Sequence, residues 1–124
     1  MKLTPAKLRY LLTIAEMEKE EAPYGVRCID LAIKMGVARA STCRMISIFI
    51  KEGLLRQCRC KTVNLTPEGQ KLLESYREQY RKLCPLFSEQ LGLSDFDAQE
   101  CALALVSCLP EGTMQQLCAK ISHL

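Results

Sequence analysis

The sequence lacks the residue sets on which most enzymes depend. It contains no tryptophan and a single histidine, His123, close to its end. It shows no Ser/His/Asp set, no HExxH motif and no glycine-rich phosphate loop. A nucleophilic cysteine needs a nearby base, and His123 is the only histidine that the sequence offers. We therefore expect a protein that is not an enzyme.

Long apolar runs are also missing. No stretch approaches the roughly 20 apolar residues of a membrane-spanning helix, and the amino terminus lacks the charged-then-apolar pattern of a signal peptide. The eight cysteines fall mostly within helical patterns, unlike those of a secreted disulfide scaffold. These features predict a cytoplasmic protein with no membrane partner, whose cysteines are mostly buried thiols.

What the sequence does contain is typical of a globular protein with two different halves. Of its 124 residues, 48% are hydrophobic and 25% are charged. Residues 1–66 carry 12 Lys and Arg against 6 Asp and Glu, and residues 67–124 carry 5 against 8. The basic half suits phosphate binding, because neutralised phosphates release counterions. The second half suits self-association.

Residues 29–55 read as a helix-turn-helix. The pattern predicts a short helix at 29–35, a turn at Gly36 and Val37, and a longer helix at 38–52 that Gly53 ends. Two apolar stripes predict the buried faces of these helices: Ile29, Ala32 and Ile33 in the first, and Thr42, Ile46, Phe49 and Ile50 in the second.

The other face of the longer helix carries small, hydroxyl and basic side chains. These are Ala40, Arg44, Ser47 and Lys51 at helical spacing, with Arg39, Ser41 and Thr42 at the helix start. Small residues let a helix approach the DNA major groove, and arginine reaches phosphates or guanine edges. The alternative is an ordinary solvated helix face.

Elements on both sides of this motif complete a winged helix. Thr4 and Pro5 begin a helix that runs toward Glu21, and residues 26–28 suit a short strand. Two further strands are predicted at 54–58 and 62–65. Their connecting tip is Arg59, Cys60 and Lys61. A basic tip is typical of a wing that contacts the DNA backbone.

The second half begins with a long helix. Thr66 and Pro67 cap its start, and an apolar stripe runs along it until Pro85, which must end or kink it. A shorter helical piece is predicted at 86–91, where Gly92 stops it.

Two more helices follow. Ser94 caps a helix that includes 101–109 and is apolar nearly all round. We expect this helix at a subunit interface, with a central core position as the alternative. Thr113 caps the last helix. The predicted fold is mainly α, a winged helix-turn-helix with a two-stranded β-wing plus a helical dimerisation domain.

Four segments together resemble the diphtheria-toxin-repressor family of metal-responsive, dimeric transcription regulators. They are YLLTIAEMEKEE, KEGLL, NLTPEGQKL and QLGLS, in this order, and the resemblance covers almost the whole chain. It implies a winged helix-turn-helix DNA-binding domain at 1–66, a helical dimerisation domain at 67–124, and an iron- or manganese-dependent repressor.

The metal-binding positions that this resemblance implies are poorly matched. Anchored on Tyr10 and Gly92, they hold Arg9, Leu12, Tyr80, Cys84, Leu103, Val106 and Ser107. Only Cys84 is a plausible ligand, whereas Mn²⁺ and Fe²⁺ prefer several oxygen and imidazole ligands. We therefore expect the usual metal site to be absent, and the sequence assigns no cofactor.

The cysteines offer another kind of switch. A soft-metal or redox centre is conceivable among Cys84, Cys101, Cys108 and Cys118, and Cys58 and Cys60 alternate along the wing. The spacing matches no zinc motif, so packing thiols are the alternative.

These patterns together predict a homodimeric transcriptional regulator, a repressor that binds double-stranded DNA at a palindromic operator. Base and nearby phosphate contacts are assigned to Arg39, Ser41, Thr42 and Arg44, beside Ala40; backbone contacts are assigned to Ser47, Lys51, Arg59 and Lys61. The alternatives are a winged-helix module that binds protein, and a regulator that responds to thiol oxidation or to a soft metal.

Overall fold

The computed structural model describes residues 3–21, 24–58 and 61–124. The chain divides into two units. Arg9–Leu73 form one, which we call the winged-helix unit; the residues up to Leu8 and Glu74–Leu124 form the other, which we call the helical unit. These two units are defined by which residues pack together. The predicted division into a DNA-binding domain at 1–66 and a dimerisation domain at 67–124 concerns function and stays a prediction.

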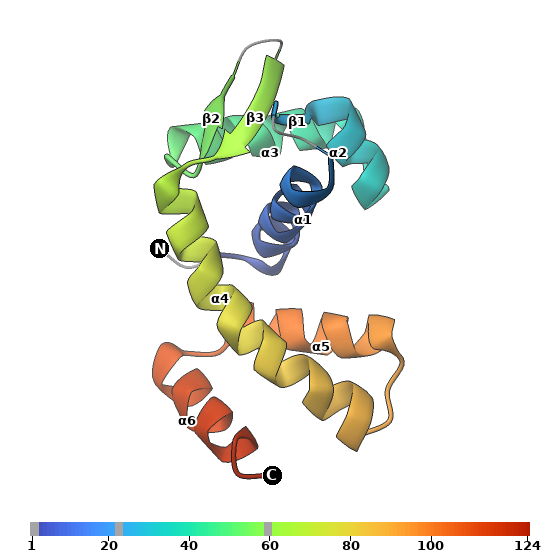
Figure 1. Ribbon diagram of the computed structural model, residues 1–124, viewed down its shortest axis with the longest axis vertical. Helices are drawn as coiled ribbons and strands as arrows, with labels where there is room; N and C mark the ends of the chain where they lie inside the picture. Colours follow the sequence, from blue (N-terminus) through green and yellow to red (C-terminus); the bar gives the residue numbers. More distant parts are fainter. Residues whose placement is uncertain (1–2, 22–23, 59–60) are drawn as a thin grey trace. The chain divides into compact units, whose positions relative to one another are not determined.

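Three described helices and a small sheet contribute to the winged-helix unit (Figure 1). They are α1 (Pro5–Glu21), β1 (Val26–Arg27), α2 (Cys28–Met35), α3 (Arg39–Lys51), β2 (Leu55–Gln57) and β3 (Thr62–Leu65). The strand β3 pairs antiparallel with both of its neighbours, in the order β1-β3-β2. The predicted winged-helix fold is confirmed, and the short strand before α2 joins the wing as a third strand.

The core of this unit joins α1 to α3. Phe49 of α3 is fully buried, and its ring meets that of Tyr10 in α1 edge-on, with centroids 6.5 Å apart and planes at 68°. Thr42 and Ile46 are buried on the same side of α3. Each large apolar side chain buried in this way contributes roughly 1.5–3 kcal/mol. Three of the four residues of the predicted apolar stripe of α3 are therefore buried, and the fourth, Ile50, is half-buried.

The buried face of α2 differs from the predicted stripe. Leu31 and Ala32 are buried, whereas Ile29 and Ile33 are 46% and 73% exposed. The helix has only 8 residues, which is too short for apolar spacing alone to decide which side meets the core. Leu31, which was not part of the predicted stripe, is buried in the core instead of Ile29 and Ile33. Gly36 ends α2 with φ 69°, in the left-handed region that the predicted turn required.

A tight junction connects the end of α3 to the start of α4 (Pro67–Pro85). The hydroxyl of Thr66 donates to the carbonyl of Gly53 at 2.6 Å and accepts from the N–H of Gly69 at 3.0 Å. The N–H of Thr66 donates to the carbonyl of Leu54 at 3.0 Å. A methyl group at Gly69 would collide with that same carbonyl oxygen of Leu54. The segments EGLL and LTPEG are thus two sides of one structural junction.

The helical unit contains the rest of α4, the π-helix η2 (Leu86–Gln90), α5 (Asp95–Cys108) and α6 (Glu111–Ile121). The α-helical hydrogen bonding of α4 ends at Pro85 and gives way to the wider turn of η2. The predicted break at this proline is therefore a change of helix type. Gly92, with φ 73°, follows η2 as predicted.

The helix α5 is capped as predicted but buries only one side. Ser94 accepts a hydrogen bond from the N–H of Asp97 at 3.1 Å. Leu103 and Val106 are buried, whereas Cys108 is exposed. One side of α5 is thus buried within the chain, and its expected place at a subunit interface stays a prediction. None of the described helices is both long and apolar enough to cross a membrane.

The last helix begins earlier than predicted. Pro110 holds the N-cap position with an extended backbone (ψ 150°), and α6 starts at Glu111. Thr113 is therefore a residue of the first turn, because the proline already sets the backbone geometry at which a helix can start.

Candidate nucleic-acid interface

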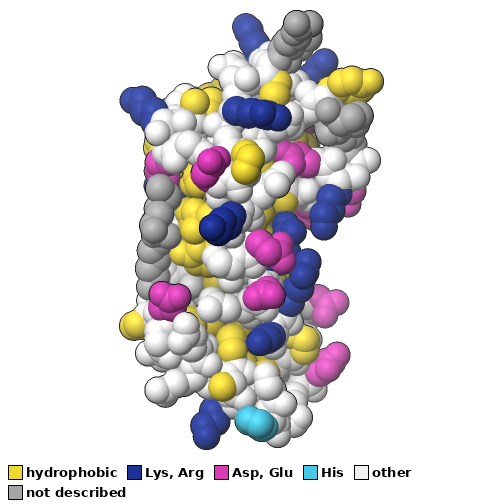
Figure 2. Space-filling view, turned by 60° about the vertical axis from the view of Figure 1, so that its left-hand side comes forward, with side chains coloured by type: hydrophobic (Ala, Val, Ile, Leu, Met, Phe, Trp, Pro, Cys, Tyr) yellow, Lys and Arg dark blue, Asp and Glu magenta, His cyan; other side chains and the backbone are white. Residues whose placement is uncertain are grey.

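The helix α3 presents a continuous polar face. Its exposed side chains include those of Arg39, Ala40, Ser41, Arg44, Ser47 and Lys51. In the view of Figure 2, the charged side chains at the wing end, at the top, are Lys and Arg. A helix that enters a DNA groove needs such a combination of small residues, hydroxyls and long cationic side chains.

The amino-terminal end of α3 adds backbone donors to this face. Ala38 holds the N-cap position without a side-chain hydrogen bond, and the described first turn of α3 contains no acidic residue. The first N–H groups of a helix carry partial positive charge and favour phosphate oxygens. Nothing in this turn opposes a bound anion electrostatically.

Thr42 departs from the predicted interface. Its side chain is fully buried, and its hydroxyl donates to the carbonyl of Ala38 at 3.2 Å. The residue lies on the core side of α3, where it had also been placed by the apolar stripe. Its side chain positions α3 in this structure and does not reach the surface, so the predicted DNA contact from Thr42 does not fit.

The wing supplies a second basic element. Lys61 is exposed and has φ 60°, a left-handed conformation that few residues other than glycine adopt. The N–H of Cys58 donates to the carbonyl of Thr62 at 2.7 Å and ties the two strands together beside it. The other predicted tip residues, Arg59 and Cys60, lie outside the described residues.

Two basic residues of the sheet were missed by sequence reasoning. Arg27 of β1 and Arg56 of β2 are exposed, each next to a buried strand residue, Val26 and Leu55. This alternation of buried and exposed positions is the signal that would have found them. Strands of two and three residues are too short to repeat this alternation, so the pattern could not be recognised in the sequence.

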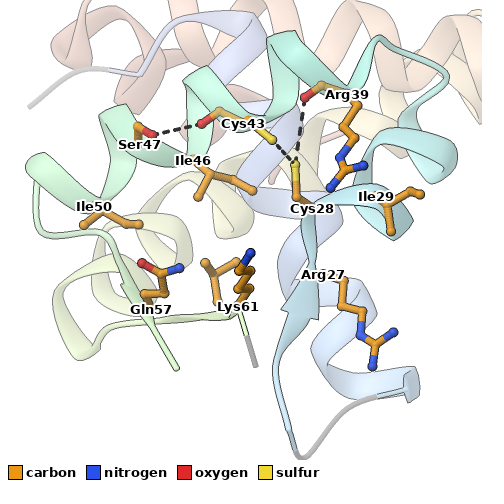
Figure 3. Close-up of a pocket in the computed structure, with 11 residues that line it drawn as sticks. Arg27, Cys28, Ile29, Arg39, Cys43, Ile46, Ser47, Ile50, Gln57 and Lys61 are labelled. Carbon is orange, nitrogen blue, oxygen red and sulfur yellow. Dashed lines mark hydrogen bonds between the residues drawn. The ribbon is translucent and has the colours of Figure 1, made fainter. Parts of the chain in front are cut away.

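A cavity of about 410 Å³ lies between α3 and the sheet (Figure 3). Ile46, Ile50 and Val63 are among its apolar lining residues. The cationic residues in its lining are Arg27, Arg39 and Lys61, and the thiols are those of Cys28 and Cys43. Arg39 of α3, Arg27 of β1 and Lys61 beside β3 thus line one concave surface.

The positions that the family resemblance assigns to a metal do not suit one. Leu103 and Val106 are apolar and buried, and the buried hydroxyl of Ser107 donates to the carbonyl of Leu103 at 2.7 Å. Burial raises the pKa of the Cys84 thiol, against a smaller opposing effect of a hydrogen bond with Tyr80. A protonated thiol is a poor metal ligand. This donor set does not fit Mn²⁺ or Fe²⁺.

The conceivable centre of four cysteines in the second half is not assembled either. Across residues 3–21, 24–58 and 61–124, no three side chains of His, Cys, Asp or Glu come close enough together to hold a metal ion. Cys118 is buried, Cys108 is exposed, and Cys84 and Cys101 are half-buried. The described side chains therefore do not form a metal centre from these four cysteines.

Comparisons with known proteins identify the fold. No protein-family model matches the sequence, and no curated protein matches it. Among solved structures, the metal-dependent transcriptional regulator MtsR is similar with a TM-score of 0.82 and 22% identity, and the manganese regulator SloR with 0.81 and 21%. Each comparison covers 98% of this chain and 56% of the other.

A third similar structure is closer in length. The hypothetical protein SSo2273 from Sulfolobus solfataricus has a TM-score of 0.73 and 20% identity, over 98% of this chain and 92% of that one. The chain spans little more than half the length of MtsR and SloR. It has the winged-helix fold of these metal-dependent transcriptional regulators, which supports at the level of fold the resemblance to the diphtheria-toxin-repressor family.

Proposed function

We propose that this chain is a DNA-binding transcriptional regulator, a repressor that binds a palindromic operator as a homodimer. The exposed face of α3 carries the proposal. It sets Arg44 and Lys51 beside hydroxyl and small side chains, on the side of α3 away from the buried Phe49, with Arg39 exposed at the start of the helix. The fold shared with proteins described as transcriptional regulators supports the same function. A binding function of this kind needs no catalytic group.

The proposed contacts are of two kinds: some side chains contact base edges and nearby phosphates, and others contact only the DNA backbone. Arg39, Ser41 and Arg44 are assigned to base edges and nearby phosphates, with Ala40 allowing close approach. Contacts to the DNA backbone are assigned to Ser47, Lys51 and Lys61, to which the structure adds Arg27 and Arg56; Arg59 stays a prediction. Thr42 is assigned to positioning of the helix.

Exposed apolar side chains of the helical unit support the homodimer. Leu91, Leu93 and Phe96 are 63%, 37% and 68% exposed within six consecutive positions between η2 and the first turn of α5. Such a group is costly in water and suits burial against a second copy. Two α3 helices related by a two-fold axis would read half-sites about 34 Å apart.

The residues at the expected metal-binding positions indicate how DNA binding depends on metal. Because Cys84 is the only plausible ligand among them, we infer that DNA binding does not require Mn²⁺ or Fe²⁺. The regulator would then keep the DNA-binding architecture without the metal switch of its structural neighbours.

A fluorescence-anisotropy titration with genomic DNA fragments tests the proposal. We expect tight, sequence-selective binding in EDTA that weakens steeply as salt is raised, with no gain from added Mn²⁺, Fe²⁺ or Zn²⁺. Selective binding that appears only with a metal would contradict the metal-independent part. No selective binding under any of these conditions would contradict the function itself.

One observation favours a second candidate, a winged-helix module that binds protein. Tyr24, Ile33 and Val37 of the winged-helix unit are 83%, 73% and 40% exposed, and apolar side chains of this kind suit a protein partner. The same titration separates the two functions, because a protein-binding module would show no selective, salt-dependent interaction with DNA.

A further inference from the structure

Two cysteines of the helix-turn-helix have sulfur atoms close to bonding distance. Cys28 begins α2 and Cys43 lies in the first half of α3, and their Sγ atoms are 2.7 Å apart. A disulfide bond has a length of about 2.05 Å. The two residues are 15 positions apart in the sequence, so it is the turn between the helices that brings them together. Only a small movement of the side chains separates this pair from a disulfide.

Both thiols line the cavity between α3 and the sheet, so the pair is open to a small molecule. Figure 3 shows Cys28 and Cys43 pointing toward each other, with the guanidinium of Arg39 nearby. Arg27 and Lys61 also line the cavity. Arg39 acts electrostatically on Cys28, so the surroundings of the two thiols favour a ligand that carries negative charge.

The environments of the two thiols give them different roles. Cys43 is exposed, whereas Cys28 is half-buried and its Sγ donates weakly to the carbonyl of Arg39 at 3.9 Å. Burial, followed by the hydrogen bond with Cys43 and the charge of Cys43, raises the pKa of Cys28 to about 11. The thiolate is the reactive form. Cys43 is therefore the thiol that meets a reagent first, and Cys28 is the one that follows.

We propose that Cys28 and Cys43 form a redox-active dithiol whose oxidant is an anionic low-molecular-weight disulfide bound by the cations of this cavity. The thiolate of Cys43 attacks one sulfur of the small disulfide, whose S–S bond breaks and releases one half as a thiolate. The thiolate of Cys28 then attacks Sγ of Cys43, forms the internal disulfide and releases the second half. The protein gives up two electrons and two protons, and the small disulfide is reduced to two thiols.

Oxidised glutathione, an anionic disulfide, is the probe for the test. The reduced full-length protein is incubated with it, quenched with acid, digested and mapped by mass spectrometry. We expect a disulfide between Cys28 and Cys43. In Cys28→Ser we expect a glutathionyl group trapped on Cys43, and in Cys43→Ser an unmodified Cys28 on the same timescale. Glutathionylation of the exposed Cys108 without any Cys28–Cys43 disulfide would overturn the proposal.

Charge selectivity tests the ligand class separately. Bis(2-hydroxyethyl) disulfide is neutral and has the same reactive bond. We expect Arg39→Gln to slow the reaction with oxidised glutathione about tenfold more than the reaction with the neutral reagent, the lower range of electrostatic steering. The neutral reagent senses the lost charge only through the thiolate of Cys28. Equal effects on both reagents would overturn the assignment of this cavity as a site for anions.

A DNA measurement connects the dithiol to the proposed function, on which this last step rests. In Cys28→Ser, the trapped glutathionyl group adds bulk and negative charge to α3. We expect DNA affinity to fall about tenfold, the scale of one lost arginine contact, and to return on reduction with dithiothreitol. An unchanged affinity would overturn this step. If the reduced protein shows no DNA binding at all, the proposed function fails. The mapping of the Cys28–Cys43 disulfide by mass spectrometry still tests the dithiol proposal in that case.

Discussion

The ring of Tyr10 in α1 meets the ring of Phe49 in α3 edge-on, and this contact holds the core side of the helix whose other side is proposed to bind DNA. Phe49→Ala should lower the free energy of unfolding by roughly 3–5 kcal/mol, because it removes a fully buried ring and leaves a cavity. Urea unfolding followed by circular dichroism measures the loss. Ile48→Ala is the control on the same helix: Ile48 is 41% exposed, and its effect should stay within about 0.5 kcal/mol. Equal losses in the two variants would contradict this assignment of the buried face.

Gly69 and Gly112 predict opposite responses to alanine. A methyl group at Gly69 would meet the carbonyl oxygen of Leu54, whereas one at Gly112 in α6 would meet open space. Gly69→Ala should therefore destabilise the protein, and Gly112→Ala should stabilise it by roughly 0.5–1 kcal/mol through helix propensity. Thermal unfolding of both variants beside the parent protein gives the comparison. An unchanged melting temperature in Gly69→Ala would contradict this prediction, because it would mean that Gly69 and Leu54 can move apart without loss of stability.

Arg44 and Lys61 should differ in the kind of DNA binding that they support. Arg44→Ala should weaken binding to the preferred sequence by roughly 1–3 kcal/mol and relax sequence preference, as expected for a base contact. Lys61→Ala should weaken all sequences alike and reduce the salt slope by about one, as expected for a phosphate contact.

Lys120→Ala is the control for this pair, since Lys120 is exposed on α6 and should leave both the affinity and the salt slope unchanged. Anisotropy titrations on specific and random DNA at several salt concentrations measure all three variants. Equal losses on specific and random DNA for both Arg44→Ala and Lys61→Ala would refute the division of roles.

Phe96→Glu should convert the dimer to a monomer. Phe96 is 68% exposed beside two other exposed apolar residues, and a buried carboxylate at a two-fold interface would face its own copy. Sedimentation velocity measures the mass. Ile33→Glu places the same charge at a 73% exposed isoleucine of the winged-helix unit and should leave the mass unchanged. A dimer that survives Phe96→Glu would exclude this segment from the interface.

The reactivity of Cys28 should depend on pH in a way that reports on Cys43. Burial, followed by the hydrogen bond and charge of Cys43, raises the pKa of Cys28 to about 11 from the ordinary 9.0, so its neutral form persists into the alkaline range. Alkylation of Cys28 by iodoacetamide should therefore be slow at neutral pH and increase with a midpoint near 11. In Cys43→Ala the midpoint should fall, because the hydrogen bond and the charge of Cys43 no longer raise the pKa of Cys28. Site-resolved mass spectrometry at low conversion gives both profiles, and identical midpoints would show that Cys43 does not perturb Cys28.

The parts of the fold that the sequence predicted well are those set by local chemistry. Pro5 opens α1, Gly36 and Gly92 adopt the left-handed conformations that end their helices, and Ser94 accepts the capping hydrogen bond. Each of these depends on neighbours within a few positions. The exposed face of α3 was predictable for the same reason, because 13 residues of helix fix its two sides.

The parts that the sequence predicted poorly depend on distant contacts. The eight-residue α2 has too few turns to show that Leu31, and not Ile33, meets the core. Thr42 satisfied both the apolar stripe and the polar face, and only packing decided between them. The approach of Cys28 to Cys43 arises from the angle between two helices, which no spacing rule for cysteines describes.

The junction of Thr66, Gly69 and Leu54 has a consequence for engineering. It connects the wing, α3 and the start of α4 through backbone groups and one hydroxyl, and it uses none of the exposed side chains of α3. The exposed positions of α3 can therefore be exchanged for those of another winged-helix protein without disturbing the contacts that set the fold. This separation makes the chain a small scaffold on which new sequence preferences can be grafted.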